Sequence, residues 1–325
     1  MGGDFAPRNV IAGAIDAMRE AGNRIAVLLV GPKSIIEKEL LQHQHGGLSF
    51  QIVDAPEVID MHDAATAGLR QKKNSSISVG ITLHKDGKAD AFVSAGHSGA
   101  VMSASTLILG RIEGIGRPTI GAFLPTVNGV CLLLDAGANV DCKPQHLYEF
   151  GVMGSIYVHA MLNVEKPTIG LLNIGEEDSK GNEVVKEAYQ LLKNSTLNFI
   201  GNVEGRDILN GKAHVVVCDG FVGNVILKFG ESVPSFFKSR LKQVAEKSFY
   251  TKLVGALMRP TLRKALKSLD YEESGGVPIL GVKGVSIIGH GSSTPKAIKN
   301  MIFRAEELVR KNINHHIQQA LVSAQ

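Results

Sequence analysis

Short apolar runs that end in glycine-rich polar turns recur along the chain, and a segment with helical periodicity follows each turn. The apolar runs read as buried strands, because they are short, rich in Val, Ile and Leu, and bounded by turn residues. Alternation of such strands with helices is typical of a parallel sheet, whose ligands bind at the carboxyl ends of the strands. The clearest of these strand-to-turn junctions are residues 91–100, 130–141, 168–183, 215–224 and 285–295. They predict one mostly parallel sheet with its polar loops gathered at one edge.

The remaining periodicity extends this α/β pattern over most of the chain. We expect helices at residues 10–21, 32–42 and 63–85, the last interrupted near 72–76. Strands are expected at 24–31 and 49–56, and one more strand-to-turn element at 201–208. A last helix is expected from Pro295 to the C-terminus, where Pro suits the first helical position. The predicted fold class is therefore α/β, with three α/β/α layers around a mostly parallel sheet. We expect one catalytic domain over residues 1–325, with two lobes as an alternative.

The alternation of predicted strands and helices stops after Val222. A long helical stretch is expected from there to about residue 255, and a second, short helix from Pro260 to about Leu269. Residues 231–270 then read as an inserted helical hairpin that protrudes from the α/β domain.

Composition and charge narrow the class of protein. The chain has 325 residues, 44% of them hydrophobic, which is ordinary for a globular protein. No apolar run is long enough to span a bilayer, and residues 1–9 do not resemble a signal peptide. The three cysteines show no metal-ligand spacing and read as reduced thiols of a cytosolic protein. The net charge is +4, and the positive charge is concentrated in residues 238–267, which hold nine Lys or Arg and one acid. A local basic segment argues against a protein whose whole surface binds nucleic acid.

The turn at residues 173–183 offers the most specific anion site. Asn182 can cap the following helix, and Lys180 lies just before its N-terminus, where a cation and the helix dipole both favour an anion. A solvated turn with Lys–Glu pairing is the alternative, since Glu176 and its acidic neighbours would repel a phosphate unless they face elsewhere.

Histidine and serine occur together in two other turns. His290, Ser292 and Ser293 precede a helix that Thr294 can cap, so they suit an oxyanion or a general acid, or else only satisfy helix N–H groups. His97 lies beside Ser98, but no GxSxG elbow is present, so a helix-start anion loop is favoured over a Ser nucleophile.

Carboxylate and amide side chains mark two further strand ends. Asp135, Asn139, Asp219 and Asn224 either orient a substrate or close and cap their own loops. The chain has neither a GxxxxGK[ST] P-loop nor a GxGxxG motif in a first βαβ unit, which disfavours kinases and ordinary dehydrogenases.

The tip of the expected hairpin is apolar and flanked by basic residues. Leu253, Val254, Leu257 and Met258 suit shallow insertion into an anionic membrane surface. Packing on a second subunit is the alternative, and the basic face also suits an acidic protein.

Seven segments in order carry a family resemblance. They are MGGDFAP, GRIEGIGRP, LLDAGANVDCKPQHL, GLLNIGEEDSKGNEVVKEAYQLL, NFIGNVEGRDI, VVVCDGFVGNVILK and IIGHGSS. Together they resemble the phosphate acyltransferase (PlsX) family of bacterial phospholipid synthesis over essentially the whole chain. The resemblance implies transfer of a long-chain acyl group from acyl-acyl-carrier-protein to inorganic phosphate, which gives acyl phosphate and free carrier protein.

The same resemblance implies further properties. The fold would be similar to isocitrate and isopropylmalate dehydrogenases and to phosphotransacetylases, with no cofactor and no metal. The protein would be a cytoplasmic homodimer, peripherally associated with the membrane, whose product passes to a membrane glycerol-3-phosphate acyltransferase. Lys180, His290 and Asn224 are the expected catalytic residues. The expected substrate or phosphate contacts are Gly96, Ser98, Gly99, Asp135, Asn139, Asn173, Gly175, Glu176, Asn182, Asp219, Gly220, Gly291, Ser292 and Ser293.

Two departures from the family pattern stand out. The family typically has an apolar strand directly before MGGDFAP, so we expect either a truncated start or an internal start codon. The family usually has Asn-Thr where this chain has His97-Ser98, and no catalytic role is carried onto His97. A phosphotransacetylase-like enzyme that uses acyl-CoA and a non-catalytic membrane-docking protein are the competing functions.

Overall fold

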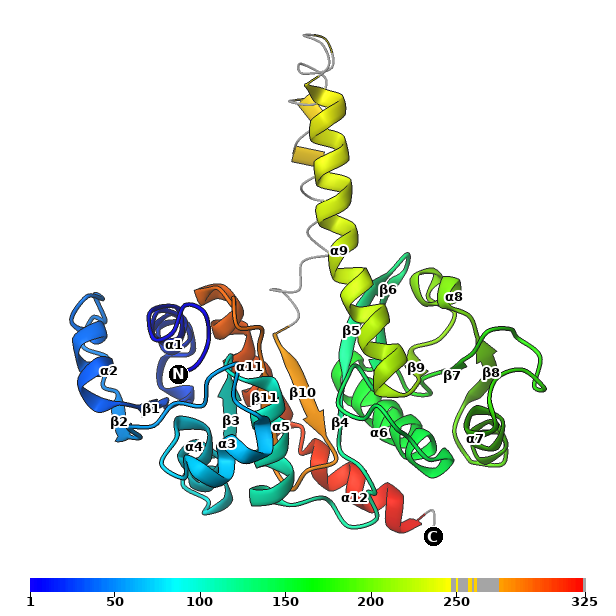
Figure 1. Cartoon of the computed structure of the whole chain (residues 1–325), viewed down its shortest axis with the longest axis horizontal. Helices are drawn as coiled ribbons and strands as arrows, with labels where there is room; N and C mark the ends of the chain where they lie inside the picture. Colours follow the sequence, from blue (N-terminus) through cyan, green and yellow to red (C-terminus); the bar gives the residue numbers. More distant parts are fainter. Residues whose placement is uncertain (247–249, 251–256, 259, 262–274, 324–325) are drawn as a thin grey trace. The chain divides into compact units, whose positions relative to one another are not determined.

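The computed structural model describes residues 1–246, 250, 257–258, 260–261 and 275–323. The chain divides into two compact units (Figure 1), and the strands of each unit pair only with strands of the same unit. Unit 1 comprises residues 1–121, 159–164 and 272–325, and unit 2 comprises residues 122–158 and 165–271.

Within the described residues, the strands of unit 1 form two sheets. The strands β1 (Leu28–Gly31) and β2 (Gln51–Asp54) pair in parallel. The second sheet has the order β3-β11-β10-β4, and its strands are β3 (Ala91–Ser94), β4 (Thr119–Ile120), β10 (Val277–Leu280) and β11 (Val285–Ile288). The helices of this unit are α1 (Arg8–Ala21), α2 (Lys33–Leu40), α3 (Ala65–Gln71), α4 (Ser76–Lys85), α5 (Ser98–Ala104), α11 (Pro295–Arg310) and α12 (Ile313–Ser323). A 3-10 turn (Gly22–Arg24) follows α1, and a π-helical turn (Ser105–Leu109) follows α5.

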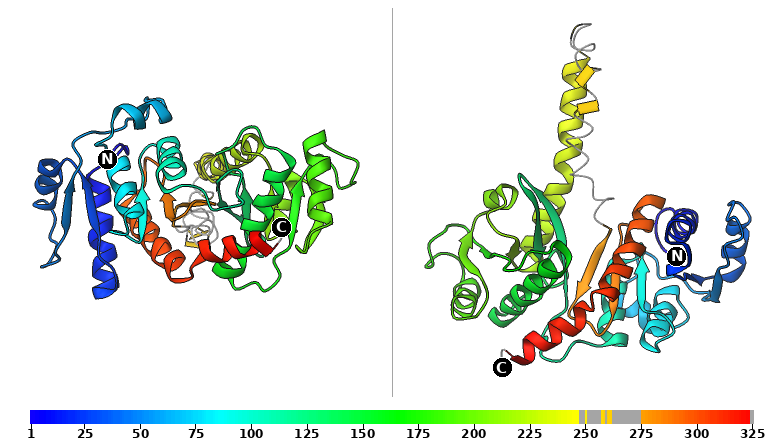
Figure 2. Two further views of the ribbon diagram at one scale, coloured as in Figure 1. Left: turned by 90° about the horizontal axis from the view of Figure 1, so that it is seen from below. Right: turned by 180° about the vertical axis from the view of Figure 1, so that it is seen from behind.

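The helices of unit 1 lie against its sheets (Figure 2), and apolar side chains pack between them. One core joins Ile77 and Ile81 of α4 and Val101 of α5 to Ile279 and Ile288 of the four-stranded sheet. The helices α1 and α11 approach closely at Gly13, where a Cβ atom would lie 2.5 Å from the Cβ of Ile298. A larger residue at position 13 would therefore push the two helices apart.

Unit 2 holds a five-stranded sheet with the order β5-β6-β9-β7-β8. Its strands are β5 (Ala122–Thr126), β6 (Gly129–Leu134), β7 (Ile169–Leu172), β8 (Phe199–Val203) and β9 (Val215–Val217). Its helices are α6 (Pro144–Leu162), which continues into unit 1, α7 (Glu183–Lys193), α8 (Gly205–Asn210) and α9 (Gly220–Ala245).

Both faces of the unit 2 sheet are covered by helices. Successive side chains of β6 point to opposite faces of the sheet, and those from Cys131 to Leu134 are all buried. Cys131 and Leu133 pack in a core with Ile208 of α8 and Ile226 of α9. On the face of α6, a Cβ atom at Gly154 would lie 2.6 Å from Val215 of β9. Unit 2 is thus a layered α/β/α arrangement.

The expectation of one sheet is wrong for the described residues, where parallel pairs still predominate but three sheets are present. The antiparallel pairs β5–β6 and β10–β11 are joined by only a few residues, and such short connections cannot make the crossover that a parallel pair needs. The expected interruption near residues 72–76 is confirmed, since α3 ends at Gln71 and α4 begins at Ser76.

The long helix expected after Val222 is α9, which begins at Gly220 and contains Pro234. It extends beyond the sheet on which it begins (Figure 1). Leu253 and Val254 of the expected hairpin tip, and residues 262–269 of the expected second helix, lie outside the described residues. Leu257 and Met258 are described, and 73% and 49% of their surfaces are exposed. No helix in the described part of the chain is long and apolar enough to cross a membrane.

Candidate active site

Three of the polar loops expected from the sequence meet at one edge of unit 2. They follow β6, β9 and β7, which are neighbours in the sheet and run parallel to one another. The carboxyl ends of these strands therefore lie side by side, as the sequence pattern predicts for ligand-binding loops.

The loop after β6 is organised around Asp135, whose side chain is fully buried. Its Oδ1 accepts hydrogen bonds from the backbone N–H groups of Gly137 (3.2 Å) and Ala138 (3.1 Å). Its Oδ2 accepts from both the backbone N–H (2.6 Å) and the side-chain amide (2.8 Å) of Asn139. In these contacts the Asp135 carboxylate accepts hydrogen bonds from groups of its own loop. They fit the alternative in which Asp135 and Asn139 close their loop.

The N-terminus of α9 is packed against this loop. The Asp219 side chain caps the helix by accepting from the N–H of Val222 (2.8 Å), and the Gly220 N–H donates to the Asn139 carbonyl (2.7 Å). A Cβ atom at Gly220 would lie 2.9 Å from Asp135 Oδ2, so only glycine lets the helix begin here. The Asn224 side chain lies against Gly137. The structure thus brings Asp135, Asn139, Asp219, Gly220 and Asn224 together.

The loop after β7 is closed by asparagine side chains. Asn173 donates from Nδ2 to the Lys180 carbonyl (3.0 Å) and accepts at Oδ1 from the N–H of Ile174 (2.8 Å). Asn182 caps α7 by accepting from the N–H of Val185 (2.9 Å), as predicted. The Lys180 Nζ lies 3.9 Å from Glu177 Oε1, and about half of its side chain is exposed. The structure thus contains the Lys–Glu pairing of the solvated-turn alternative, on a lysine side chain that is about half exposed.

Glu176, expected to contact phosphate, points its carboxylate to another partner. Its Oε1 lies 2.6 Å from the Nζ of Lys212, which follows α8. Neither Lys212 nor Asn202, whose Nδ2 donates to the Glu177 carbonyl (2.8 Å), was expected from the sequence. One sequence signal for Lys212 was available. Glu204 and Asp207 form an E-x-x-D capping box, which predicts a short helix that ends at Gly211, directly before Lys212.

Unit 1 gathers a second set of polar loops, because β3 and β11 are parallel neighbours. The Asp4 N–H donates to the Gly291 carbonyl (2.8 Å), and the Gly289 N–H donates to the Ser94 carbonyl (2.8 Å). A Cβ atom at Gly3 would lie 2.7 Å from the Ala95 oxygen. Gly96, Ser98, Gly99, Gly291, Ser292 and Ser293 all lie in or beside these loops.

His290 is held by its own turn. Its Nδ1 accepts from the Ser292 N–H (3.3 Å) and contacts the Ser292 Oγ (2.7 Å), while Ser293 Oγ donates to the His290 carbonyl (2.6 Å). In this arrangement the neutral ring carries its proton on Nε2. Thr294 caps α11 by accepting from the N–H of Ala297 (3.3 Å), as predicted.

His97 has a structural role. Its Nδ1 accepts from the Ala100 N–H (3.2 Å) and so caps α5, while its Nε2 contacts the Asp63 carbonyl (2.9 Å). Both ring nitrogens are engaged, so His97 is not placed to take a proton from Ser98. This argues against the Ser nucleophile, in agreement with the sequence analysis.

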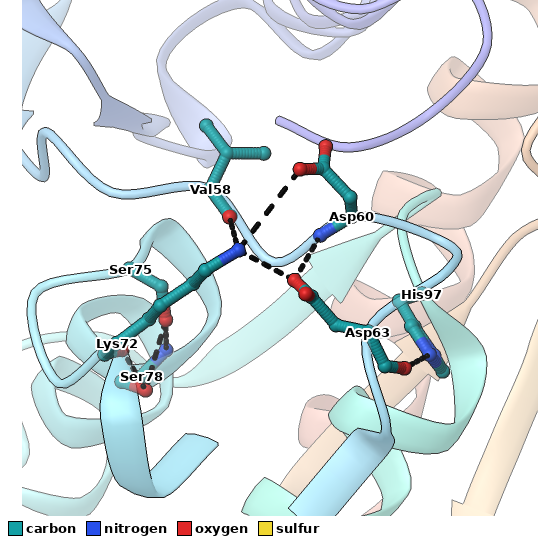
Figure 3. A network of polar contacts seen from close by, with 7 residues as sticks. All are labelled: Val58, Asp60, Asp63, Lys72, Ser75, Ser78 and His97. Carbon is teal, nitrogen blue, oxygen red and sulfur yellow. Dashed lines mark hydrogen bonds and ion pairs between the residues drawn. The ribbon is translucent and has the colours of Figure 1, made fainter. Parts of the chain in front are cut away.

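A lysine completes the network around His97 (Figure 3). Lys72 donates from Nζ to the Val58 carbonyl (2.8 Å) and to Asp63 Oδ2 (2.5 Å). The hydrogen bond from Lys72 holds the pKa of the Asp63 carboxyl below its usual value, and the same bond raises the pKa of Lys72. Two segments of unit 1 are thereby fastened to the start of α5.

Two of the three cysteines, Cys131 and Cys218, are buried. Over the part of the chain that the structure describes, no group of three or more His, Cys, Asp or Glu side chains is arranged to hold a metal ion. Burial raises the pKa of the Cys131 thiol to about 12 and that of Cys218 well above its ordinary value.

Solved structures of known proteins share this fold. A phosphotransacetylase from Streptococcus pyogenes matches 94% of this chain and 92% of its own, with a TM-score of 0.61 and 17% identity. The EutD phosphotransacetylase from Staphylococcus aureus matches 93% of this chain and 91% of its own, with a TM-score of 0.58 and 15% identity. A putative 4-hydroxythreonine-4-phosphate dehydrogenase from Salmonella typhimurium has a TM-score of 0.51 at 10% identity and covers 93% of this chain and 95% of its own. The fold is therefore that of phosphotransacetylase-like α/β proteins.

Sequence comparison identifies the family. The model of a family described as "Fatty acid synthesis protein" matches residues 1–316. A phosphate acyltransferase from Chlorobaculum tepidum is 47% identical over 99% of this chain and 100% of its own length. Another from Geobacter sulfurreducens is 47% identical over 99% of this chain and 92% of its own length. The chain belongs to the phosphate acyltransferase family, as the motif resemblance predicts.

Proposed function

We propose that this protein transfers a long-chain acyl group from acyl-acyl-carrier-protein to inorganic phosphate, as the first step of phospholipid synthesis. One observation carries the proposal, namely the 47% identity to a phosphate acyltransferase over the full length of that relative. The products are acyl phosphate and free carrier protein.

The chemistry needs an anion site and a site for developing charge. A phosphate oxygen attacks the thioester carbonyl carbon, a C–O bond forms, and the carbonyl oxygen becomes an oxyanion. The C–S bond then breaks, and the leaving thiolate takes a proton. Loops that hold phosphate near attack geometry supply much of the rate enhancement, and donors aimed at the oxyanion supply more.

The catalytic roles fall on three residues. Lys180 offers a partly exposed ammonium group for phosphate or the oxyanion. His290 carries its proton on Nε2 when neutral, which suits a donor to phosphate or to the leaving thiolate. Asn224 would position the substrate beside the loop of Asp135.

The remaining assignments concern substrate contacts. Asn173, Gly175, Asn182, Gly96, Ser98, Gly99, Gly291, Ser292 and Ser293 are proposed to supply N–H, amide or hydroxyl donors. Asp135, Asn139, Asp219 and Gly220 are proposed to act by holding the loops in place, since their groups bond to one another. Glu176 is proposed to hold its loop through its contact with Lys212.

A phosphotransacetylase-like reaction with acyl-CoA is the second candidate. The similarity of fold to two phosphotransacetylases favours it. Only the donor separates the two reactions, so a direct comparison of acyl-carrier-protein and acyl-CoA decides between them.

Finer properties of the family belong to the same proposal. We propose a dehydrogenase-like arrangement, a catalytic domain over residues 1–325 made of two lobes, and a protruding hairpin at residues 231–270. We also propose a cytoplasmic homodimer that associates peripherally with anionic membranes and delivers its product to a membrane glycerol-3-phosphate acyltransferase. Exposed aromatic side chains on α9 support a contact of this kind, since Phe229, Phe236 and Phe237 are 71%, 60% and 53% exposed.

The test is a single-turnover assay. The purified protein is incubated with long-chain acyl-carrier-protein, with and without inorganic phosphate, and release of free carrier protein is followed by gel mobility. We expect release only with phosphate. Phosphate-independent release, or none from folded protein, contradicts the proposal.

Lys180→Ala tests the site. We expect loss of phosphate-dependent release with an unchanged unfolding midpoint. Lys186→Ala is the matched control, since Lys186 pairs with Glu183 on the exposed face of α7. Wild-type rates for Lys180→Ala would remove Lys180 from the site.

A further inference from the structure

The loop that carries Lys180 also carries three acidic residues, Glu176, Glu177 and Asp178. Carboxylates close to a phosphate site weaken anion binding, because like charges repel. An anion site on this loop therefore needs a device that neutralises these carboxylates or turns them away.

Lys212 supplies such a device for one of the three, Glu176, whereas Glu177 lies 3.9 Å from Lys180 itself. The Nζ of Lys212 lies 2.6 Å from Glu176 Oε1 and 3.4 Å from Asp207 Oδ2, so one ammonium group bridges the loop and α8. The Glu176 carboxylate is held toward α8 by this contact.

The α8 end of the bridge is fixed by the backbone. Asp207 Oδ2 also accepts from the N–H of Glu204 (2.9 Å), within the capping box that begins α8. Gly211 ends α8 in the left-handed conformation, with φ of 72°, which delivers Lys212 back to Asp207. Only 12% of the Asp207 side chain is exposed.

Ionisation supports the same arrangement. The hydrogen bond to Glu176 raises the pKa of Lys212 above its ordinary value. The N–H of Glu204 and, to a smaller extent, Lys212 lower the pKa of Asp207. The ammonium group and the Asp207 carboxylate are therefore both charged at neutral pH.

A second contact fastens the same loop at the next residue. Asn202, of which only 3% is exposed, donates from Nδ2 to the Glu177 carbonyl (2.8 Å). The β8–α8 segment thus holds the loop through one backbone contact and one charge contact. Only the charge contact changes the electrostatics of the loop.

We propose that Lys212 is a positioning residue for phosphate binding, which neutralises Glu176 and holds it away from Lys180. The proposal rests on the proposed function, because it assigns phosphate to the loop of Lys180. Lys212 sets the affinity of that loop for phosphate and takes no part in the bond-making steps.

The test is a double-mutant cycle that removes the charges of Lys212 and Glu176 separately and together. In Lys212→Met, we expect the KM for phosphate to rise about fivefold to tenfold with kcat within about twofold, as one uncompensated surface charge has an effect of this size. Lys212→Arg keeps the charge and should keep the KM. Adding Glu176→Gln to Lys212→Met should bring the KM most of the way back, because the charge that needed neutralising is gone.

Two controls separate electrostatics from a general structural effect. Lys186→Met removes a lysine of unit 2 whose side chain is 40% exposed, against 36% for Lys212, and should leave the KM for phosphate unchanged. Raising the ionic strength should shrink the ratio of the Lys212→Met and wild-type KM values, since salt screens exposed charges.

The outcomes are distinguishable. An unchanged KM in Lys212→Met, or a raised KM that Glu176→Gln does not restore, overturns the role of Lys212. If wild-type protein shows no phosphate-dependent release, the proposed function fails, and calorimetric titration of inorganic phosphate into the same variants then decides the role of Lys212 by the same criteria.

Discussion

Gly223 allows α9 to begin directly against the loop of Asp135. A Cβ atom at Gly223 would lie 1.8 Å from the Asp135 backbone oxygen, whereas ordinary contacts of a Cβ atom begin at 3.4 Å. In Gly223→Ala, the helix and the loop must therefore separate by the difference, about 1.6 Å. The obstacle is a backbone atom that cannot rotate away, so we expect a loss of about 3 kcal/mol or more of unfolding free energy.

Urea unfolding followed by circular dichroism measures this loss. We expect the midpoint to fall by about 1 M or more, given the usual dependence of unfolding free energy on urea. Phosphate-dependent release should fall about 100-fold, because a displacement of about 1 Å near reacting groups has effects of that order.

Gly205→Ala is the matched control. Gly205 begins α8 in the same unit, and apart from its chain neighbours and its own helix backbone no atom lies within 4 Å of the position of its Cβ. We expect it to unfold within about 0.5 kcal/mol of the wild type, or to be slightly more stable. An equal midpoint for Gly223→Ala and wild type would refute the close approach of α9 and the Asp135 loop.

Three other predictions concern single contacts. Because the pKa of Asp63 is lowered in the folded state, its charge stabilises unit 1 at neutral pH, and this contribution is lost as the pH falls through that lowered pKa. Asp63→Asn should therefore be less stable than wild type at pH 7, and urea midpoints should converge below about pH 4; a constant difference would contradict this. Native iodoacetamide labelling at pH 8 should modify partly exposed Cys142 and spare Cys131, as read by peptide mass spectrometry, and rapid labelling of Cys131 would be inconsistent with its burial. Asn182→Ala should lower the unfolding free energy by about 1 kcal/mol through loss of the α7 cap, and no change in thermal midpoint would argue against that cap.

The sequence was a good guide to local structure. Asn182 and Thr294 precede helices in the pattern of N-caps, and both make the expected hydrogen bonds. Such signals involve residues only three positions apart, so neighbouring side chains are enough to determine them. The interruption between α3 and α4 was predictable for the same reason.

Contacts between distant residues were not predictable. The Lys212–Glu176 pair joins residues 36 positions apart, and its formation depends on the order of β7, β8 and the helices between them. The division into separate sheets was also not predictable from the hydrophobic pattern. Strand periodicity indicates which side chains are buried, but it does not indicate which strand pairs with which.

The role of His97 depended on a partner 34 residues away. A histidine beside a serine in a glycine-rich turn suits several functions, and only the position of the Asp63 carbonyl distinguishes a cap from an anion ligand. Loop residues are therefore the least predictable part of the candidate site.

The strand order of unit 1 has a consequence for biosynthesis. Its four-stranded sheet places β11 and β10 between β3 and β4, so the two inner strands come from the last quarter of the chain. The strand β4 has no partner in this sheet until Leu280 has been synthesised, and β3 has none until Ile288 has been synthesised. Unit 2 lies in the interrupting stretch and needs no later strand, so it can form its sheet during translation. Premature termination before β10 should therefore release chains whose second unit is folded and whose first unit is a substrate for chaperones and proteases.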